Sequence, residues 1–98
     1  MPMTHDDVRS RLRDHAGWEL QGDALARQFT FPSFPDAMAF VTRLAFDAEA
    51  SDHHPDLLVR YRRVTVTWST HSEGGVTERD FTGVEQAERV AAAFAADR

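Results

Sequence analysis

Three of the five histidines in the chain lie in one stretch that also carries several carboxylates. His53 and His54 are adjacent, and His71 follows a run of alternating residues, while Glu49 and Asp80 bound the stretch on its two sides. Imidazole is the side chain whose unperturbed pKa lies nearest neutrality, so it can serve as an acid or as a base. The stretch therefore indicates proton-transfer chemistry.

The composition excludes several other kinds of chemistry. The 98 residues include no Cys and no Lys, which excludes thiol catalysis, thiolate metal ligands, disulfides and lysine Schiff bases. Sixteen acidic residues against eleven basic ones give a net charge of -5, which disfavours direct binding to nucleic acid or to anionic membranes. No apolar run approaches the ~20 residues that cross a bilayer, and the N-terminus lacks signal-peptide features, so we expect a cytoplasmic protein.

A three-histidine zinc site is the main chemical alternative. Pro55 directs His54 toward an extended conformation, in which neighbouring side chains point apart. His53 and His54 would then rarely bind one ion, so we expect no metal. His5 and His15 lie outside the stretch and are expected to face solvent. A single histidine here would be interpreted as a loop or capping residue, but three histidines at this spacing favour a role in catalysis.

Capping residues and apolar spacing predict two helices in the first half of the chain. Thr4 with Asp7 fits a helix start, and this short helix should run to about Asp14. Ser33 fits the start of a longer helix that should end near Ala50. One stripe of this helix recurs at helical spacing and should face the core: Ala37, Phe40, Val41, Leu44 and Ala48.

Period-two alternation predicts a first hairpin. Its strands are expected at 18–20 and 25–31, with a turn at 21–23. Trp18 begins this hairpin, where it either packs in the core or stacks on a flat heterocycle in a binding pocket.

A second region of alternation follows the histidine pair. The run 58–71 is predicted as a strand whose polar face ends at His71. A glycine pair should turn the chain into a short strand over 76–80. Thr82 and Glu85 then fit the capping box of a last helix.

Together these elements predict one α+β domain that spans residues 1–98. Their order is α-β-β-α-β-β-α, and hairpin-like joints favour a four-stranded antiparallel sheet with the helices packed on one face. A sheet this small leaves exposed edges, which invite pairing, so we expect an oligomer.

The sequence resembles the pterin-4a-carbinolamine dehydratase family. The likeness rests on E-x-x-x-H-H-P-D at 49–56, S-T-H at 69–71 and T-E-R-D at 77–80, in this order, and it continues upstream between residues 17 and 46. The resemblance implies an enzyme that removes water from 4a-hydroxytetrahydrobiopterin to give quinonoid dihydrobiopterin, by histidine acid–base catalysis. No redox cofactor, nucleotide or metal is implied.

The resemblance also implies roles for single residues. His53, His54 and His71 match the three active-site histidines of the family. The residues that match substrate-contacting segments, or that could stack on the pterin, are Trp18, His53, His54, Pro55, Thr70, His71 and Ser72.

Carboxylates are expected to orient these imidazoles. Asp80 matches the acidic residue that supports the family's histidines in catalysis, and Glu49 and Asp52 precede the histidine pair as further supports. The sequence departs from the family at Leu57, where an aromatic residue is usual, which bears on substrate affinity. Trp68 is expected to refill that volume from the core side.

Two classes of function are weighed. The first is the dehydratase, with a pterin as substrate, a homodimeric or homotetrameric assembly, and a functional link to an aromatic amino-acid hydroxylase whose cofactor it recycles. The second is a non-catalytic interaction or dimerisation module on the same fold. Such a module would not need all three histidines, so their presence favours the enzyme.

Overall fold

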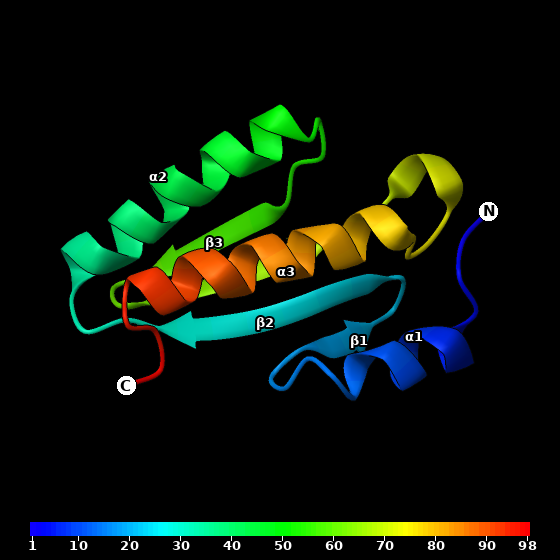
Figure 1. The fold of residues 1–98 in the computed structure, drawn as a ribbon, viewed down its shortest axis with the longest axis horizontal. Helices are drawn as coiled ribbons and strands as arrows, with labels where there is room; N and C mark the ends of the chain where they lie inside the picture. The colour runs from blue at the N-terminus through cyan, green and yellow to red at the C-terminus, as the bar shows by residue number, and fades with distance from the viewer.

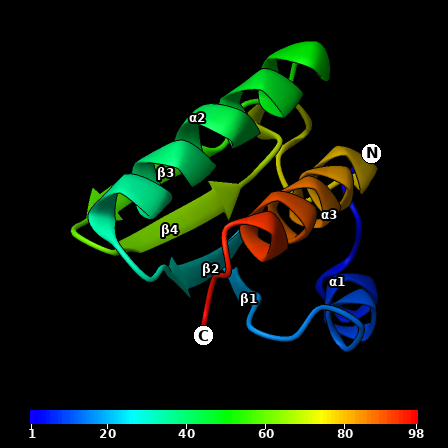
Figure 2. The same cartoon turned by 60° about the vertical axis from the view of Figure 1, so that its left-hand side comes forward.

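The fold is described from a computed structural model that covers residues 1–98. Four strands form one antiparallel sheet in the spatial order β1-β2-β4-β3. The elements along the chain are α1 (His5–Leu12), β1 (Glu19–Gln21), β2 (Ala24–Thr30), α2 (Phe34–Ala50), β3 (Asp56–Arg60), β4 (Arg63–Trp68), the short 3-10 helix η1 (His71–Glu73) and α3 (Glu78–Ala93). Figures 1 and 2 show α2 and α3 lying across one face of the sheet, with α1 beside β1. The predicted α+β architecture and its element order are confirmed.

The core lies between the sheet and the helices. The antiparallel register of β2 and β4 sets Leu25 opposite Trp68 and Phe29 opposite Val64. All four side chains are buried, because alternate residues of a strand point to the same face. Burying side chains of this size stabilises a fold by roughly 1.5–3 kcal/mol each, so this face holds the helices onto the sheet.

The first two helices begin at the predicted caps. The Thr4 hydroxyl accepts a hydrogen bond from the Asp7 amide at 3.1 Å, and the Ser33 hydroxyl accepts one from the Asp36 amide at 3.2 Å. These bonds satisfy amides that have no partner inside the helix. The second helix ends at Ala50, as predicted, whereas the first ends slightly early. None of the helices combines the length and apolar character needed to cross a bilayer.

The predicted strand over 58–71 is wrong, because this segment folds as a hairpin. Arg60 pairs with Arg63, so β3 and β4 are joined by a two-residue turn. Tyr61 occupies the first turn position with φ of 54°. Hairpin turns of this length need a positive φ, which Gly, Asn and Asp usually supply. Because Tyr is not a typical residue of such turns, the alternating pattern predicted one continuous strand where the structure has two.

The predicted strand over 76–80 is also wrong. The last helix already begins at Glu78, and its capping box is formed by Thr77 and Asp80, not by the predicted pair that starts at Thr82. The Asp80 carboxylate accepts the Thr77 amide at 3.0 Å. An Asp can accept the N-cap amide as Glu does, so T-E-R-D is itself a helix-start signal.

Candidate active site

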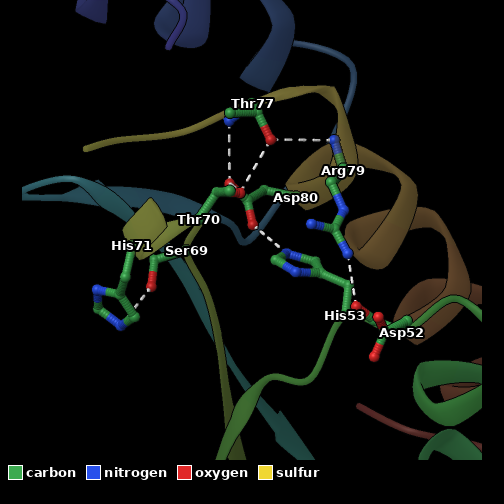
Figure 3. Close-up of polar contacts among 8 residues, drawn as sticks. All are labelled: Asp52, His53, Ser69, Thr70, His71, Thr77, Arg79 and Asp80. Atoms are coloured by element: carbon green, nitrogen blue, oxygen red, sulfur yellow. Dashed lines mark hydrogen bonds and ion pairs between the residues drawn. The ribbon is translucent and has the colours of Figure 1, made fainter. Parts of the chain in front are cut away.

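Three segments carry the predicted site residues, and the contacts at their centre are shown in Figure 3. They are the loop after α2, the end of β4 with η1, and the first turn of α3. The prediction that His71 ends a strand on its polar face is wrong. β4 ends at Trp68, and His71 is the first residue of η1. The site therefore lies at one end of the sheet, where helix ends and a short connection meet.

The end of α2 fixes the position of His53. Asp52 has a left-handed φ of 50°. The His53 amide donates to the Ala48 carbonyl and the Asp52 amide donates to the Glu49 carbonyl, each at 3.1 Å. This is the hydrogen-bond pattern of a Schellman cap, which reverses the chain directly after a helix. Gly usually occupies the left-handed position, and Asp is one of the few residues that tolerate it.

The buried Asp80 carboxylate is the centre of the polar network. Its Oδ1 lies 2.6 Å from His53 Nε2, and its Oδ2 accepts the Thr70 hydroxyl at 2.8 Å and the Thr77 amide at 3.0 Å. Asp80 is 0% exposed and the His53 side chain is 11% exposed. Because a carboxylate only accepts, His53 Nε2 carries the shared proton and the other ring nitrogen is left for chemistry. The structure thus places the Asp80 carboxylate in contact with one of the three histidines, while its supporting role in catalysis stays a prediction.

His54 has a different partner. Its Nε2 lies 2.8 Å from Glu49 Oε1, and both side chains are more than half exposed. Asp52 contributes its backbone carbonyl, which accepts a hydrogen bond from Arg79 Nη2 at 2.5 Å. No carboxylate contact joins Asp52 to a histidine, so its predicted support is limited to shaping the chain.

His71 lies apart from the other two histidines. Its Nε2 is 3.2 Å from the Ser69 hydroxyl, and the residue is exposed. Figure 3 shows its ring turned away from His53, on the far side of Thr70. A hollow of about 230 Å³ adjoins it and is lined by Asp23, Ala24, Ser69, Thr70, His71, Gly74 and Gly75.

His53 borders a separate hollow of about 140 Å³, whose other lining residues are Ser51, Arg79 and Thr82. No hollow is lined by two of the three predicted histidines. Arg79 was missed by sequence reasoning, although it stands between the two acids of the T-E-R-D motif. Its guanidinium donates to the Asp52 carbonyl, and Arg79 lines the same hollow as His53.

The carboxylate on η1 next to the site has a lowered pKa. Glu73 accepts a hydrogen bond from the N-terminal amine of Met1 at 2.8 Å, which lowers the pKa of Glu73 below its ordinary value of 4.5. The ion pair adds to the effect, because a nearby positive charge favours the ionised carboxylate. Glu73 shares a third hollow with Ser72.

The histidines do not converge on a common point. No group of three or more His, Cys, Asp or Glu side chains in the structure could hold a metal ion. Each of the three imidazoles has its own separate polar partner. The zinc alternative therefore lacks the clustered ligand set that such a site requires.

Trp18 belongs to the core and not to the site. It is 5% exposed and meets Phe29 edge-on, with ring centroids 5.9 Å apart. Of the two interpretations of Trp18, stacking on a heterocycle or packing in the core, the structure shows packing in the core. Leu57 is half-buried against the core, while Trp68 lies fully buried beneath His53.

The expectation that His15 faces solvent is wrong. Its side chain is 14% exposed, and its Nδ1 lies 3.1 Å from both carboxylate oxygens of Glu88. The ring also packs against Phe81, which ties the end of α1 to α3. His5 is exposed, as expected, beside Asp23.

Comparison with known proteins gives a consistent result. The family model described as pterin 4 alpha carbinolamine dehydratase matches residues 1–90. A protein of Roseiflexus sp. (strain RS-1) named "Putative pterin-4-alpha-carbinolamine dehydratase" is 44% identical over 84 residues, which cover 86% of this chain and 90% of that protein.

Two solved structures share the fold. The crystal structure of a transcriptional coactivator/pterin dehydratase from Brucella melitensis has a TM-score of 0.87 and 38% identity, covering 93% of this chain and 99% of that chain. A pterin dehydratase-like protein identified as a RuBisCO assembly factor in the alpha-carboxysome has a TM-score of 0.67 and 25% identity, covering 79% of this chain and 92% of that chain. The chain described here therefore belongs to the pterin-4a-carbinolamine dehydratase family.

Proposed function

We propose that this protein is a dehydratase that converts 4a-hydroxytetrahydrobiopterin to quinonoid dihydrobiopterin and water. The observation that carries the proposal is the buried His53–Asp80 pair, with an Nε2 to Oδ1 distance of 2.6 Å. Every remaining acceptor contact of this carboxylate goes to Thr70 or Thr77. The imidazole is thus held at the edge of a hollow, with one ring nitrogen available to a substrate.

The reaction needs one proton donor and one proton acceptor. The donor protonates the hydroxyl oxygen on C4a, the C4a–O bond breaks, and water leaves. The N5 lone pair forms the C4a=N5 double bond, and the acceptor takes the proton from N5. No electrons are gained or lost overall, so histidines suffice, and each acid or base typically contributes ~10²–10⁴-fold.

The arrangement of the histidines supports separate donor and acceptor residues. His53 and His54 follow α2, whereas His71 lies on η1, beyond the Thr70–Asp80 contact. We assign one proton transfer to the His53/His54 side of this contact and the other to the His71 side, and either side can hold the proton donor. The Thr70 hydroxyl is already bonded to Asp80, so its part is to position the carboxylate.

The remaining predicted contact residues stay part of the proposal. Pro55 fixes the direction of the chain after His54, and Ser72 lies on η1 next to His71. Ser72 lines the third hollow together with Thr70 and Thr77, and we propose that a flat pterin bound there would meet these polar groups. We propose that no metal or organic cofactor takes part.

Stopped-flow absorbance tests the function directly. The protein, free of added metal and nucleotide, should accelerate the formation of quinonoid dihydropterin from freshly generated 4a-hydroxytetrahydropterin above the buffer rate. A chelator should leave the rate unchanged. A rate equal to the buffer control, with folding confirmed by circular dichroism, would remove the enzyme and leave the interaction module. Loss of rate on chelation, with stoichiometric zinc, would restore the metal alternative.

We also propose that the chain associates as a homodimer or homotetramer. β3 is an edge strand of the sheet, and its Leu58 is exposed. Phe46, on the outer side of α2, is 70% exposed. An unpaired edge beside exposed apolar side chains favours association. Light scattering should give a mass of at least twice 11.1 kDa, and a monomer at micromolar concentration would contradict the proposal.

The substrate implies a supplying reaction. A 4a-hydroxytetrahydropterin arises when a tetrahydropterin-dependent hydroxylase transfers one oxygen atom to an aromatic amino acid. We therefore propose a functional link to such a hydroxylase. Adding the protein to a hydroxylase assay at limiting pterin should raise the sustained rate, and a variant that lacks His71 should raise it less.

A further inference from the structure

Trp68 and Gly83 fit together beneath the candidate site. A Cβ atom added to Gly83 would lie 2.5 Å from Cδ2 and Cε2 of the Trp68 indole. These atoms belong to a rigid ring, so the contact could not be relieved by turning the end of a flexible side chain. Any side chain at position 83 would push the indole out of its place.

The backbone does not require glycine at this position. Gly83 lies inside α3, where its conformation is helical and open to any residue. Glycine is less favourable than alanine in a helix interior, since it loses more conformational freedom on folding. The close approach of the Trp68 ring is therefore the physical reason that the structure offers for Gly83.

The same indole supports the His53 ring. The centroids of the two rings are 5.4 Å apart, and their planes differ by 23°. Trp68 is fully buried, and its Nε1 has no hydrogen-bond partner. No polar contact holds the indole, so packing alone sets its position and, with it, the surface on which His53 rests.

We infer that Trp68 is a positioning residue for the dehydration, and that Gly83 provides the space that keeps its indole under His53. The inference rests on the proposed function for its catalytic meaning. Asp80 holds the imidazole by its edge, but a single hydrogen bond leaves the ring free to tilt about it. The stacked indole removes this freedom. Asp80 and Gly83 lie one turn apart on α3, so one rigid helix fixes both contacts.

Gly83→Ala tests this arrangement. The added methyl group should displace the indole and tilt His53, which should lower kcat by about 10-fold or more while KM changes by less than about twofold. In proton NMR, the chemical shifts of the His53 ring protons should change, because these protons move relative to the ring current of the indole. The His71 signals should stay. The signals that disappear in the spectrum of the His53→Asn variant are assigned to the His53 ring.

Two further variants separate positioning from general packing. Glu85→Ala changes an exposed residue of the same helix and should leave both kcat and the His53 signals as they are. Trp68→Phe combined with Gly83→Ala makes room for the methyl group. The double variant should therefore show a higher kcat than Gly83→Ala alone, which would be a non-additive rescue.

Specific results would overturn the inference. One is a folded Gly83→Ala variant whose kcat and His53 signals equal those of the wild type. The inference also fails if this variant has a lower melting temperature but the same kcat and the same His53 signals. If Gly83→Ala does not fold, Trp68→Phe and Trp68→Leu replace it. Phe keeps an aromatic surface under His53, so equal kcat and equal His53 shifts in these two variants would reject the inference. An inactive wild type removes the dehydratase assignment, while the His53 shifts still test the placement of the ring.

Discussion

The two histidine-bearing halves of the site differ in how firmly the fold holds them. His53 is bonded to a fully buried carboxylate and rests on a buried indole. His71 lies on a three-residue helix, is exposed, and has a single polar contact of 3.2 Å to Ser69. The first imidazole is therefore oriented before a substrate arrives, whereas the second can adjust to it. Removing the His53 side chain should therefore affect folding and rate together, whereas removing the His71 side chain should affect rate alone.

The largest effect is expected for Asp80→Ala. The change removes the acceptor of the Thr77 amide in the capping box, the partner of His53 and the acceptor of the Thr70 hydroxyl. Each buried donor left without an acceptor costs about 1–3 kcal/mol, so the free energy of unfolding should fall by about 3 kcal/mol or more. Urea denaturation measures this loss. Asp80→Asn retains one acceptor oxygen and should lose less. Equal stability of Asp80→Ala and the wild type would remove Asp80 from the centre of the site.

The comparison is sharpest between His53→Ala and His71→Ala. Each should lower kcat by about 10-fold or more, the range for losing one acid–base group, and His54→Ala should do the same. Only His53→Ala should also lower the free energy of unfolding, by about 1–3 kcal/mol, because it leaves Asp80 partly unsatisfied. Stopped-flow rates and urea denaturation, with far-UV circular dichroism to confirm folding, give both quantities. Equal stability losses in His53→Ala and His71→Ala would show that the two sides are held alike.

His15→Ala is the control for a histidine that is held but not used. The partly buried pair with Glu88 and the contact with Phe81 should be lost, lowering the free energy of unfolding by about 0.5–1.5 kcal/mol. The dehydration rate should not change, because His15 lies outside the site. A matching loss of kcat would mean that the other histidine variants act through folding.

The smallest effect is expected on η1, for Glu73→Gln. The pKa of Glu73 is lowered in the fold by its hydrogen bond to the N-terminal amine, so its contribution exists above the ordinary pKa of 4.5. That contribution is lost as the pH falls through the lowered pKa. The wild type should melt slightly above the variant at pH 7, and the difference should vanish in strong acid. A difference that grows in acid would contradict this sign.

Local signals in the sequence predicted the two early helices. Thr4 and Ser33 are capping residues whose effect is confined to one turn, so they could be recognised without tertiary information. The positive φ of Tyr61 could not be recognised, because Tyr rarely adopts it, and that of Asp52 could not be located, because an Asp at a helix end tolerates it without requiring it. The turn at Tyr61 hid the division of the 58–71 segment into two strands, and the turn at Asp52 hid the reversal of the chain directly before the histidine pair.

The pairing of acids with histidines also lay beyond the sequence. Spacing along a helix suggested Glu49 as a support for the histidine pair, but only the reversal of the chain after α2 brings it to His54. Asp80 reaches His53 because α3 begins earlier than predicted. The motif indicated which residues to consider, whereas the end of α2 and the start of α3 determine which of their side chains are in contact.

The double role of Asp80 affects how related sequences should be interpreted. A chain that has lost the reaction would still need the Thr77–Asp80 capping box to begin its last helix. We therefore expect selection for folding alone to retain this pair after the catalytic demand has gone. The exposed His54 and His71 have no comparable structural duty and should be free to drift. In a relative of uncertain activity, these two positions should thus be more informative about catalysis than the T-E-R-D motif.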